Sequence, residues 1–159
     1  MTTTPAIRPA ESVPAALEKQ GGHPVLLATL GVPFDDAAGT FAIDSALESG
    51  QVLIVANITR LEPLPLSVRL GYDSLDEFTP ELAQAIRAPA ERARSLGVRV
   101  ERLRVRSPRP ITALLQLAKE RVPGLLVFGP QRSSLSARRY ERAARAVRNG
   151  APCLVWLPH

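Results

Sequence analysis

The stretch that decides the fold is residues 122–158, which read VPGLLVFGPQRSSLSARRYERAARAVRNGAPCLVWLP. It contains an apolar run, a polar loop that opens with Gly129, an arginine-rich segment with helical spacing, and a second apolar run. In α/β proteins this order of strand, loop, helix and strand forms phosphate-binding loops, because a glycine and a helix N-terminus both offer backbone amides. The stretch therefore predicts an α/β fold.

The rest of the chain repeats the alternation. Apolar runs predict strands covered on both faces at residues 24–30, 51–58, 125–128 and 153–157. Residues 98–105, VRVERLRV, alternate apolar and charged side chains, which predicts a strand near a sheet edge with one face in water. Caps, prolines and glycines predict helices at residues 37–49, 79–96, 111–121 and 137–148. Pro89 lies inside the second helix, where it should kink the helix or divide it in two.

Nine alternating elements predict a three-layer α/β/α fold with a parallel sheet and right-handed crossovers. In such sheets, ligands bind at the carboxyl ends of the strands, where the winding direction reverses. Residues 1–22 are rich in Pro, Thr and Ala and are expected to form a flexible arm. A single domain is then expected over residues 23–159, with residues 59–78 as a long excursion that lacks a helical period.

The composition is that of a soluble globular protein. The 159 residues are 45% hydrophobic and 22% charged, and a chain of this length can bury its own core. No apolar run approaches the roughly 20 residues of a membrane-spanning helix, and no signal peptide is evident. A cytoplasmic protein without a membrane partner is therefore expected. The single cysteine, Cys153, excludes an internal disulfide and is expected to be a packed thiol.

Arginine carries nearly all of the positive charge, because Lys19 and Lys119 are the only lysines in a chain of net charge +5. Nucleic-acid binding is not favoured, since aromatic residues, which stack on bases, make up only 4%. A small anionic ligand remains an alternative, because guanidinium groups bind phosphate or carboxylate in a bidentate manner. The last predicted helix has a narrow apolar stripe of Tyr140, Ala143, Ala144 and Val147. Its arginines, at positions 138, 139, 142, 145 and 148, are expected to form a solvated helix face.

Several segments, taken in order, resemble the universal stress protein family over about residues 24–157. VLLATLG resembles its opening strand, ERARSLGVRVE its junction of helix and edge strand, and RPITALLQLAKE a helix entered through a proline. GLLVFG and APCLVW resemble its last two strands. The resemblance implies a five-stranded parallel sheet in the order 3-2-1-4-5. The loops after Leu30 and Gly129 would then face each other across one crevice.

Nucleotide-binding members of that family follow the fourth strand with Gly-x2-Gly-x9-Gly-Ser/Thr. This chain keeps Gly129, but Arg132 stands at the second glycine, and Glu141 and Arg142 stand near the Gly-Ser/Thr pair. Leu30 takes the place of the acidic residue of the family's opening strand. Arg132 could contact phosphate with its side chain, but three lost features outweigh this one gain. The nucleotide site is therefore predicted to be degenerate.

The candidate crevice for a nucleotide or anion comprises Thr29, Leu30, Ala56, Gly129, Arg132, Ser133, Ser134 and Arg142. No cofactor is predicted, with ATP or another adenine nucleotide as the alternative. Ser136 is expected to cap the last helix, and Ser133 and Ser134 to be solvated loop residues. The alternative is that these three serines line an anion pocket.

No catalytic or metal-binding motif is present, because the chain lacks a nucleophile elbow, a Gly-x4-Gly-Lys loop and a cluster of metal ligands. Asp35 and Asp36 are expected to cap a helix rather than to bind a metal. The leading prediction is a non-enzymatic stress-response module with lost or altered ATP binding. The two alternatives are a nucleotide binder with arginines in its phosphate loop, and an adaptor that docks an acidic protein or nucleic acid on the arginine-rich helix.

The family resemblance also implies a homodimer joined through the terminal strand. The predicted interface residues are Leu154, Val155, Trp156 and Leu157. Their apolar side chains and the unpaired backbone of an edge strand are suited to pairing with a second copy. Trp156 could anchor that interface, and a core tryptophan is the alternative.

Overall fold

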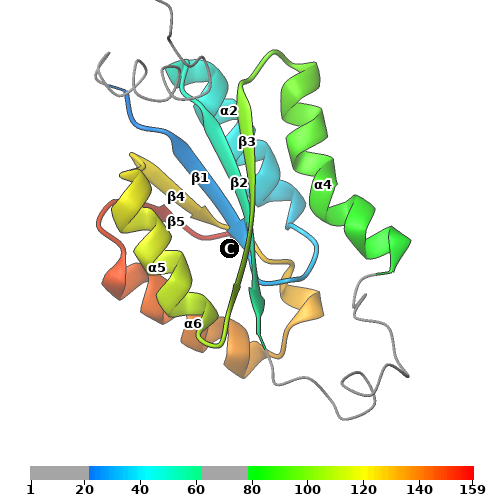
Figure 1. Cartoon of the computed structure of the whole chain (residues 1–159), viewed down its shortest axis with the longest axis vertical. Helices are drawn as coiled ribbons and strands as arrows, with labels where there is room; N and C mark the ends of the chain where they lie inside the picture. Colours follow the sequence, from blue (N-terminus) through cyan, green and yellow to red (C-terminus); the bar gives the residue numbers. More distant parts are fainter. Residues whose placement is uncertain (1–21, 62–78) are drawn as a thin grey trace, which may run out of the picture.

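The computed structural model describes residues 22–61 and 79–159 (Figure 1). Its strands are β1 (Val25–Thr29), β2 (Leu53–Arg60), β3 (Val100–Ser107), β4 (Leu125–Phe128) and β5 (Leu154–Trp156). Its helices are α2 (Asp36–Ser49), α4 (Pro80–Ser95), α5 (Pro110–Arg121) and α6 (Ala137–Gly150), with a 3₁₀ turn, η1 (Arg132–Ser134). Residues 1–21 of the predicted arm and residues 62–78 of the predicted excursion lie outside the described residues. At residues 59 and 60 the chain is still strand, so β2 runs farther than predicted.

The strands form one parallel sheet in the order β3-β2-β1-β4-β5, which confirms the predicted topology. Helices α2 and α4 cover one face, and α5 and α6 cover the other (Figure 1). The winding direction reverses between the neighbouring strands β1 and β4. A ligand crevice is therefore expected beyond their carboxyl ends.

Each face of the sheet has its own hydrophobic core, which explains why the β1 sequence is apolar without interruption. Leu26 and Ala28 face α5 and α6, whereas Val25 and Leu27 face α2 and α4. All four side chains are almost fully buried. Burial of one such leucine contributes about 2 kcal/mol to stability. The middle of the sheet is therefore a rigid base for the loops at its ends.

The helix N-termini have the expected caps. Asp35 Oδ1 accepts a hydrogen bond of 2.9 Å from the Ala38 amide, and Ser136 Oγ accepts one of 3.1 Å from the Arg139 amide. Thr79 Oγ1 caps α4 in the same way, at 3.2 Å from the Leu82 amide. Helix α4 passes through Pro89 without a break, so the alternative of two helices is wrong. The reason is burial: Pro89, Ala90 and Ala93 hold this half of the helix in the core.

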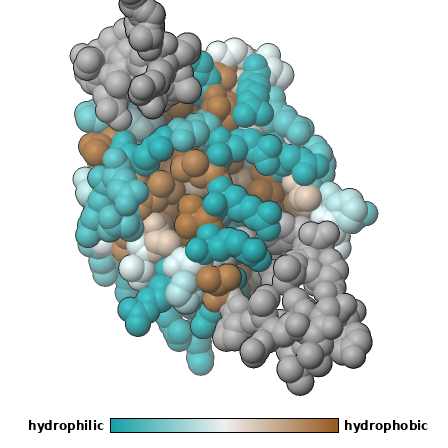
Figure 2. All heavy atoms as spheres, viewed as in Figure 1, coloured by the Kyte–Doolittle hydropathy of each residue, from teal (hydrophilic) through white to brown (hydrophobic). Residues whose placement is uncertain are grey.

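Strand β3 is an edge of the sheet, as predicted from its alternating sequence. Leu103 and Val105 pack against the core under α5, whereas Arg102, Arg104 and Arg106 are exposed on the other side. Figure 2 shows hydrophilic residues over most of the described surface on this side of the molecule, with apolar residues visible between them. None of the helices within residues 22–61 and 79–159 has the length and apolar character to cross a membrane.

Candidate functional site

The predicted crevice lies where the loop after β1 meets the loop after β4. The Asp35 amide donates a hydrogen bond of 2.9 Å to the Gly129 carbonyl, and the Gln131 amide donates one of 2.8 Å to the Pro33 carbonyl. Phe34 and Pro130 form an antiparallel bridge between these hydrogen bonds. The two loops are therefore joined by their backbones directly beyond the strand ends.

Gly129 is required by the packing of this junction. A Cβ atom at this position would lie 2.6 Å from Ala38 Cβ and 3.2 Å from Leu27 Cδ1. The absence of a side chain lets the first turn of α2 approach the end of β4. The Gly129 amide itself donates a hydrogen bond of 2.8 Å to the Ala28 carbonyl. The glycine thus has a structural reason to be present, whether or not a phosphate binds.

Several backbone amides around the crevice already have partners in the protein. The Gly31 amide donates to Asn57 Oδ1 at 2.8 Å. Within η1, the Ser134 amide donates to the Gln131 carbonyl at 3.0 Å, and the Leu135 amide donates to the Arg132 carbonyl at 3.1 Å. With Asp35 and Gln131, five amides around the crevice are bonded to protein acceptors. A phosphate bound by these amides would have to replace existing hydrogen bonds.

The three candidate ligand-binding residues at the strand ends, Thr29, Leu30 and Ala56, are buried. Leu30 is only 6% exposed and belongs to the core beneath α5 and α6, as does Ala56. The Thr29 hydroxyl donates a hydrogen bond of 2.8 Å to the Val32 carbonyl, which keeps it within the β1 loop. Leu30 gives the crevice no polar group with which to hold a nucleotide or its metal ion.

Arg132 lies over the ring of Tyr140, with 4.5 Å between its guanidinium carbon and the ring centroid. Tyr140 also packs near Phe128, with ring centroids 6.1 Å apart. The Tyr140 hydroxyl is buried and has no hydrogen-bond partner among the described residues. Burial raises the pKa of Tyr140, and the Arg132 charge opposes that rise. The sequence pattern identified Tyr140 as part of a buried stripe but did not reveal this unpaired hydroxyl.

The remaining loop candidates are exposed. Ser134 Oγ donates a hydrogen bond of 2.8 Å to Gln131 Oε1, and Ser133 makes no side-chain hydrogen bond within the part of the chain described. Ser136 is occupied as the cap of α6. Glu141 and Arg142 lie in the second turn of α6, where backbone amides bond within the helix. The structure thus groups Arg132 and Ser134 at η1 and places Arg142 on the outer face of α6.

The rest of that outer face is basic. All of its arginines are exposed, at positions 138, 139, 142, 145 and 148. Tyr140, Ala143, Ala144 and Val147 form the buried stripe, as the periodicity predicted. Residues 22–61 and 79–159 contain no group of three or more His, Cys, Asp or Glu side chains placed to hold a metal ion.

The terminal strand β5 forms the other edge of the sheet. Leu154 is 75% exposed, and Val155, Trp156 and Leu157 are half-buried. The Trp156 ring stacks on Phe41 of α2, with centroids 4.5 Å apart and planes inclined by 12°. Cys153 is partly buried against the core, and this burial raises the pKa of its thiol.

Comparison with known proteins identifies a single family. The model of the "Universal stress protein family" matches residues 22–158. No curated protein matches the sequence. A universal stress protein whose structure is known in complex with cAMP is 22% identical in sequence, with a TM-score of 0.57, and the match covers 87% of this chain and 97% of the other.

Two further structures have the same fold. A universal stress protein from Archaeoglobus fulgidus is 20% identical, with a TM-score of 0.61, and the match covers 89% of this chain and 98% of the other. A family member from Arabidopsis thaliana with AMP bound is 15% identical, with a TM-score of 0.55, and the match covers 86% of this chain and 90% of the other. At these identities the likeness concerns the fold.

Proposed function

The chain belongs to the universal stress protein family, and from this premise we propose that it is a non-enzymatic, homodimeric stress-response module in which ATP binding is lost or altered. The site that would hold a nucleotide in this fold is the crevice beyond β1 and β4. The proposal concerns what that crevice can still bind.

The observation that carries the proposal is the pairing of the amides around the crevice. Phosphate loops bind through free backbone amides and the open N-terminus of a helix. Here the amides of Gly31, Asp35, Gln131, Ser134 and Leu135 are bonded to protein acceptors. Two of those bonds join the two loops, so a triphosphate that used them would have to separate the loops. Each buried hydrogen bond left unmade costs about 1–3 kcal/mol.

One observation favours a second candidate, an adenine-nucleotide binder with altered contacts. The Arg132 guanidinium and the unpaired Tyr140 hydroxyl lie together beside the N-terminus of α6. Both groups can donate hydrogen bonds to an anion. Two structurally similar proteins of this family are known with cAMP and with AMP bound. In this candidate, side chains would replace the backbone contacts of the glycine-rich loop.

Isothermal titration calorimetry with ATP, ADP and AMP, with and without magnesium, separates the two candidates. Under the main proposal the wild-type protein shows no affinity for ATP tighter than about 100 µM, a binding free energy near −5.5 kcal/mol. An affinity tighter than this, abolished by Arg132→Ala and retained by Arg145→Ala, would establish the second candidate instead. Arg145 is the matched control because it is an exposed arginine of α6 outside η1.

A further inference from the structure

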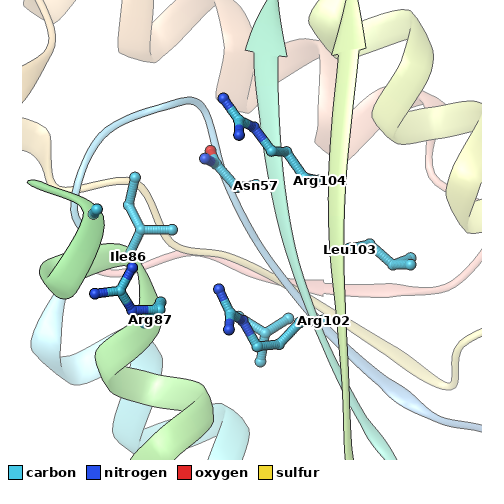
Figure 3. A pocket seen from close by; sticks show the side chains of 8 residues that line it. Asn57, Ile86, Arg87, Arg102, Leu103 and Arg104 are labelled. Atoms are coloured by element: carbon cyan, nitrogen blue, oxygen red, sulfur yellow. The ribbon is translucent and has the colours of Figure 1, made fainter. Parts of the chain in front are cut away.

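A cavity of about 390 Å³ lies on the opposite side of β3 from α5, between α4 and the strands β2 and β3. Its lining comprises Val55, Asn57, Ala83, Ile86, Arg87, Arg102, Leu103 and Arg104 (Figure 3). None of these residues belongs to the candidate crevice. Its volume falls within the range of small-molecule sites in proteins. We refer to this cavity as the arginine pocket.

The pocket follows from the alternating sequence of β3. In the register of the sheet, Arg102 lies opposite Val55 and Arg104 lies opposite Asn57. Residues two apart on a strand face the same side, so both arginines extend toward α4, whereas Leu103 points to the other side (Figure 3). The C-terminal half of α4 packs through Pro89, Ala90 and Ala93. Its N-terminal half stands over charged side chains, which leaves space between helix and sheet.

The polar groups of the pocket are donors. Arg87 lines the pocket from α4, but its guanidinium lies along the helix and points away from Arg102 and Arg104 (Figure 3). Asn57 is only 5% exposed, and its Oδ1 already accepts the Gly31 amide at 2.8 Å. Its NH2 group makes no hydrogen bond to any described residue and is left to donate. No acidic residue is among the lining residues that the structure describes.

The charges of Arg87 and Arg102 are only weakly compensated from outside the pocket. Arg87 donates a hydrogen bond of 3.2 Å to Gln84 Oε1, and its Nε lies 3.9 Å from Glu91 Oε1 on the surface of α4. Arg102 forms no ion pair within the described part of the chain. Like charges gathered in a concave site repel one another, so an anion that enters the pocket gains from every guanidinium.

We propose that the arginine pocket binds a small organic phosphate. A phosphate monoester carries a charge of −1.5 to −2 at pH 7, which matches paired guanidinium groups better than the single charge of a carboxylate does. Arg102 holds the phosphate, Arg87 and Arg104 add positive charge around it, and the Asn57 NH2 group donates to a phosphate oxygen. Val55, Ala83 and Ile86 pack against the organic part of the ligand.

The test is calorimetry of the full chain with phenyl phosphate, with inorganic phosphate and benzoate as companion probes. Phenyl phosphate should bind more tightly than either, because only it has both the dianionic group and an apolar ring. Arg102→Ala should weaken its binding by about ten- to hundredfold, the loss expected for one charge-assisted contact. Arg102→Lys keeps the positive charge but loses the planar guanidinium that can bind phosphate in a bidentate manner. Its affinity for phenyl phosphate should therefore lie between those of the wild type and of Arg102→Ala.

Arg106→Ala is the matched control, because Arg106 is an exposed arginine of the same strand and does not line the pocket. It should change the affinity by less than about twofold, since exposed charges beyond a contact are screened. Equal weakening by Arg106→Ala and Arg102→Ala would mean diffuse attraction to a basic surface and would overturn the proposal. Absence of binding by phenyl phosphate at millimolar concentration would also overturn it.

The two sites are tested independently. Arg132→Ala should leave phenyl phosphate binding unchanged, because Arg132 lies at η1 and not in the pocket. Loss of binding in that variant would place the ligand in the crevice and refute the pocket. ATP binding in the crevice would refute the proposed function, but it would not decide whether phenyl phosphate binds in the arginine pocket.

Discussion

Gly129 illustrates how one residue can fit two different explanations. In a phosphate loop, a glycine at this position lets backbone amides approach an anion. In the structure, a side chain would collide with Ala38 and Leu27, and the amide is bonded to the Ala28 carbonyl. A sequence pattern cannot separate the two explanations, because both need the same residue. Leu30 behaves differently: its apolar side chain indicated a lost polar contact, and the structure places it in the core.

We expect Gly129→Ala to destabilise the protein by about 1–3 kcal/mol, because the new methyl group would lie against the first turn of α2. Urea denaturation measures this loss directly. Gly150→Ala is the matched control, since its Cβ would meet only the flexible end of Leu115 at the end of a helix. That control should shift the free energy of unfolding by less than about 0.5 kcal/mol. Equal effects of the two substitutions would refute the packing role of Gly129.

Tyr140 gives a prediction about alkaline pH. Its pKa is raised in the folded protein by burial, whereas in the unfolded chain a tyrosine ionises near its ordinary value of about 10. Above that value the unfolded state binds fewer protons than the folded state, so stability falls as the pH rises. We expect Tyr140→Phe to lose less stability than wild type between pH 8 and pH 10.5 in urea titrations. Parallel curves for the two proteins would contradict this expectation.

At the scale of elements, local signals in the sequence were sufficient wherever a cap or an apolar run determined the structure. The caps Asp35, Thr79 and Ser136 were found where the sequence indicated them. Two features were not predicted. The turn η1 has no periodic signal, since it is held by backbone hydrogen bonds over a few residues. The continuity of α4 through Pro89 depends on tertiary packing, which overrides the local preference for a break.

The cap of α6 can be tested by removing its side-chain oxygen. Ser136→Ala should lower the free energy of unfolding by about 1 kcal/mol, because the Arg139 amide would lose its acceptor. Ser133→Ala is the control, because Ser133 is an exposed serine of the same loop without a side-chain hydrogen bond to the described residues. Thermal and urea denaturation of both variants give the comparison. A control as unstable as Ser136→Ala would show that the loop, and not the cap, supports the helix.

At the scale of the whole molecule, periodicity established the alternation of strands and helices but not their spatial order. Each right-handed crossover can add a strand on either side of the previous one, depending on which face its helix covers. The order 3-2-1-4-5 was implied by the family resemblance, and the structure confirms it. The arginine pocket was not predicted, although VRVERLRV contained its signal. The alternating sequence predicted that one face of β3 is exposed to solvent. Only the fold shows that half of α4 lies over that face.

The proposed homodimer through β5 leads to a prediction at the same scale. Leu154→Lys should give a monomer in analytical ultracentrifugation, because the exposed leucine of the edge strand would become a charge at the interface. Leu96→Lys is the matched control, since Leu96 is 53% exposed at the end of α4, far along the chain from β5. It should leave the dimer intact. A wild-type protein that sediments as a monomer would refute the dimer itself.

The contrast between the two sheet edges also limits how large an assembly can grow. β5 ends the sheet with apolar side chains, whereas β3 ends it with a row of exposed guanidinium groups at Arg102, Arg104 and Arg106. A copy approaching β3 edge to edge would bring like charges together across the new pair, which is unfavourable. If two copies pair through β5, as proposed, growth by strand addition would therefore stop after that step. The proposed dimer would thus be a closed two-fold particle and not the start of a fibre.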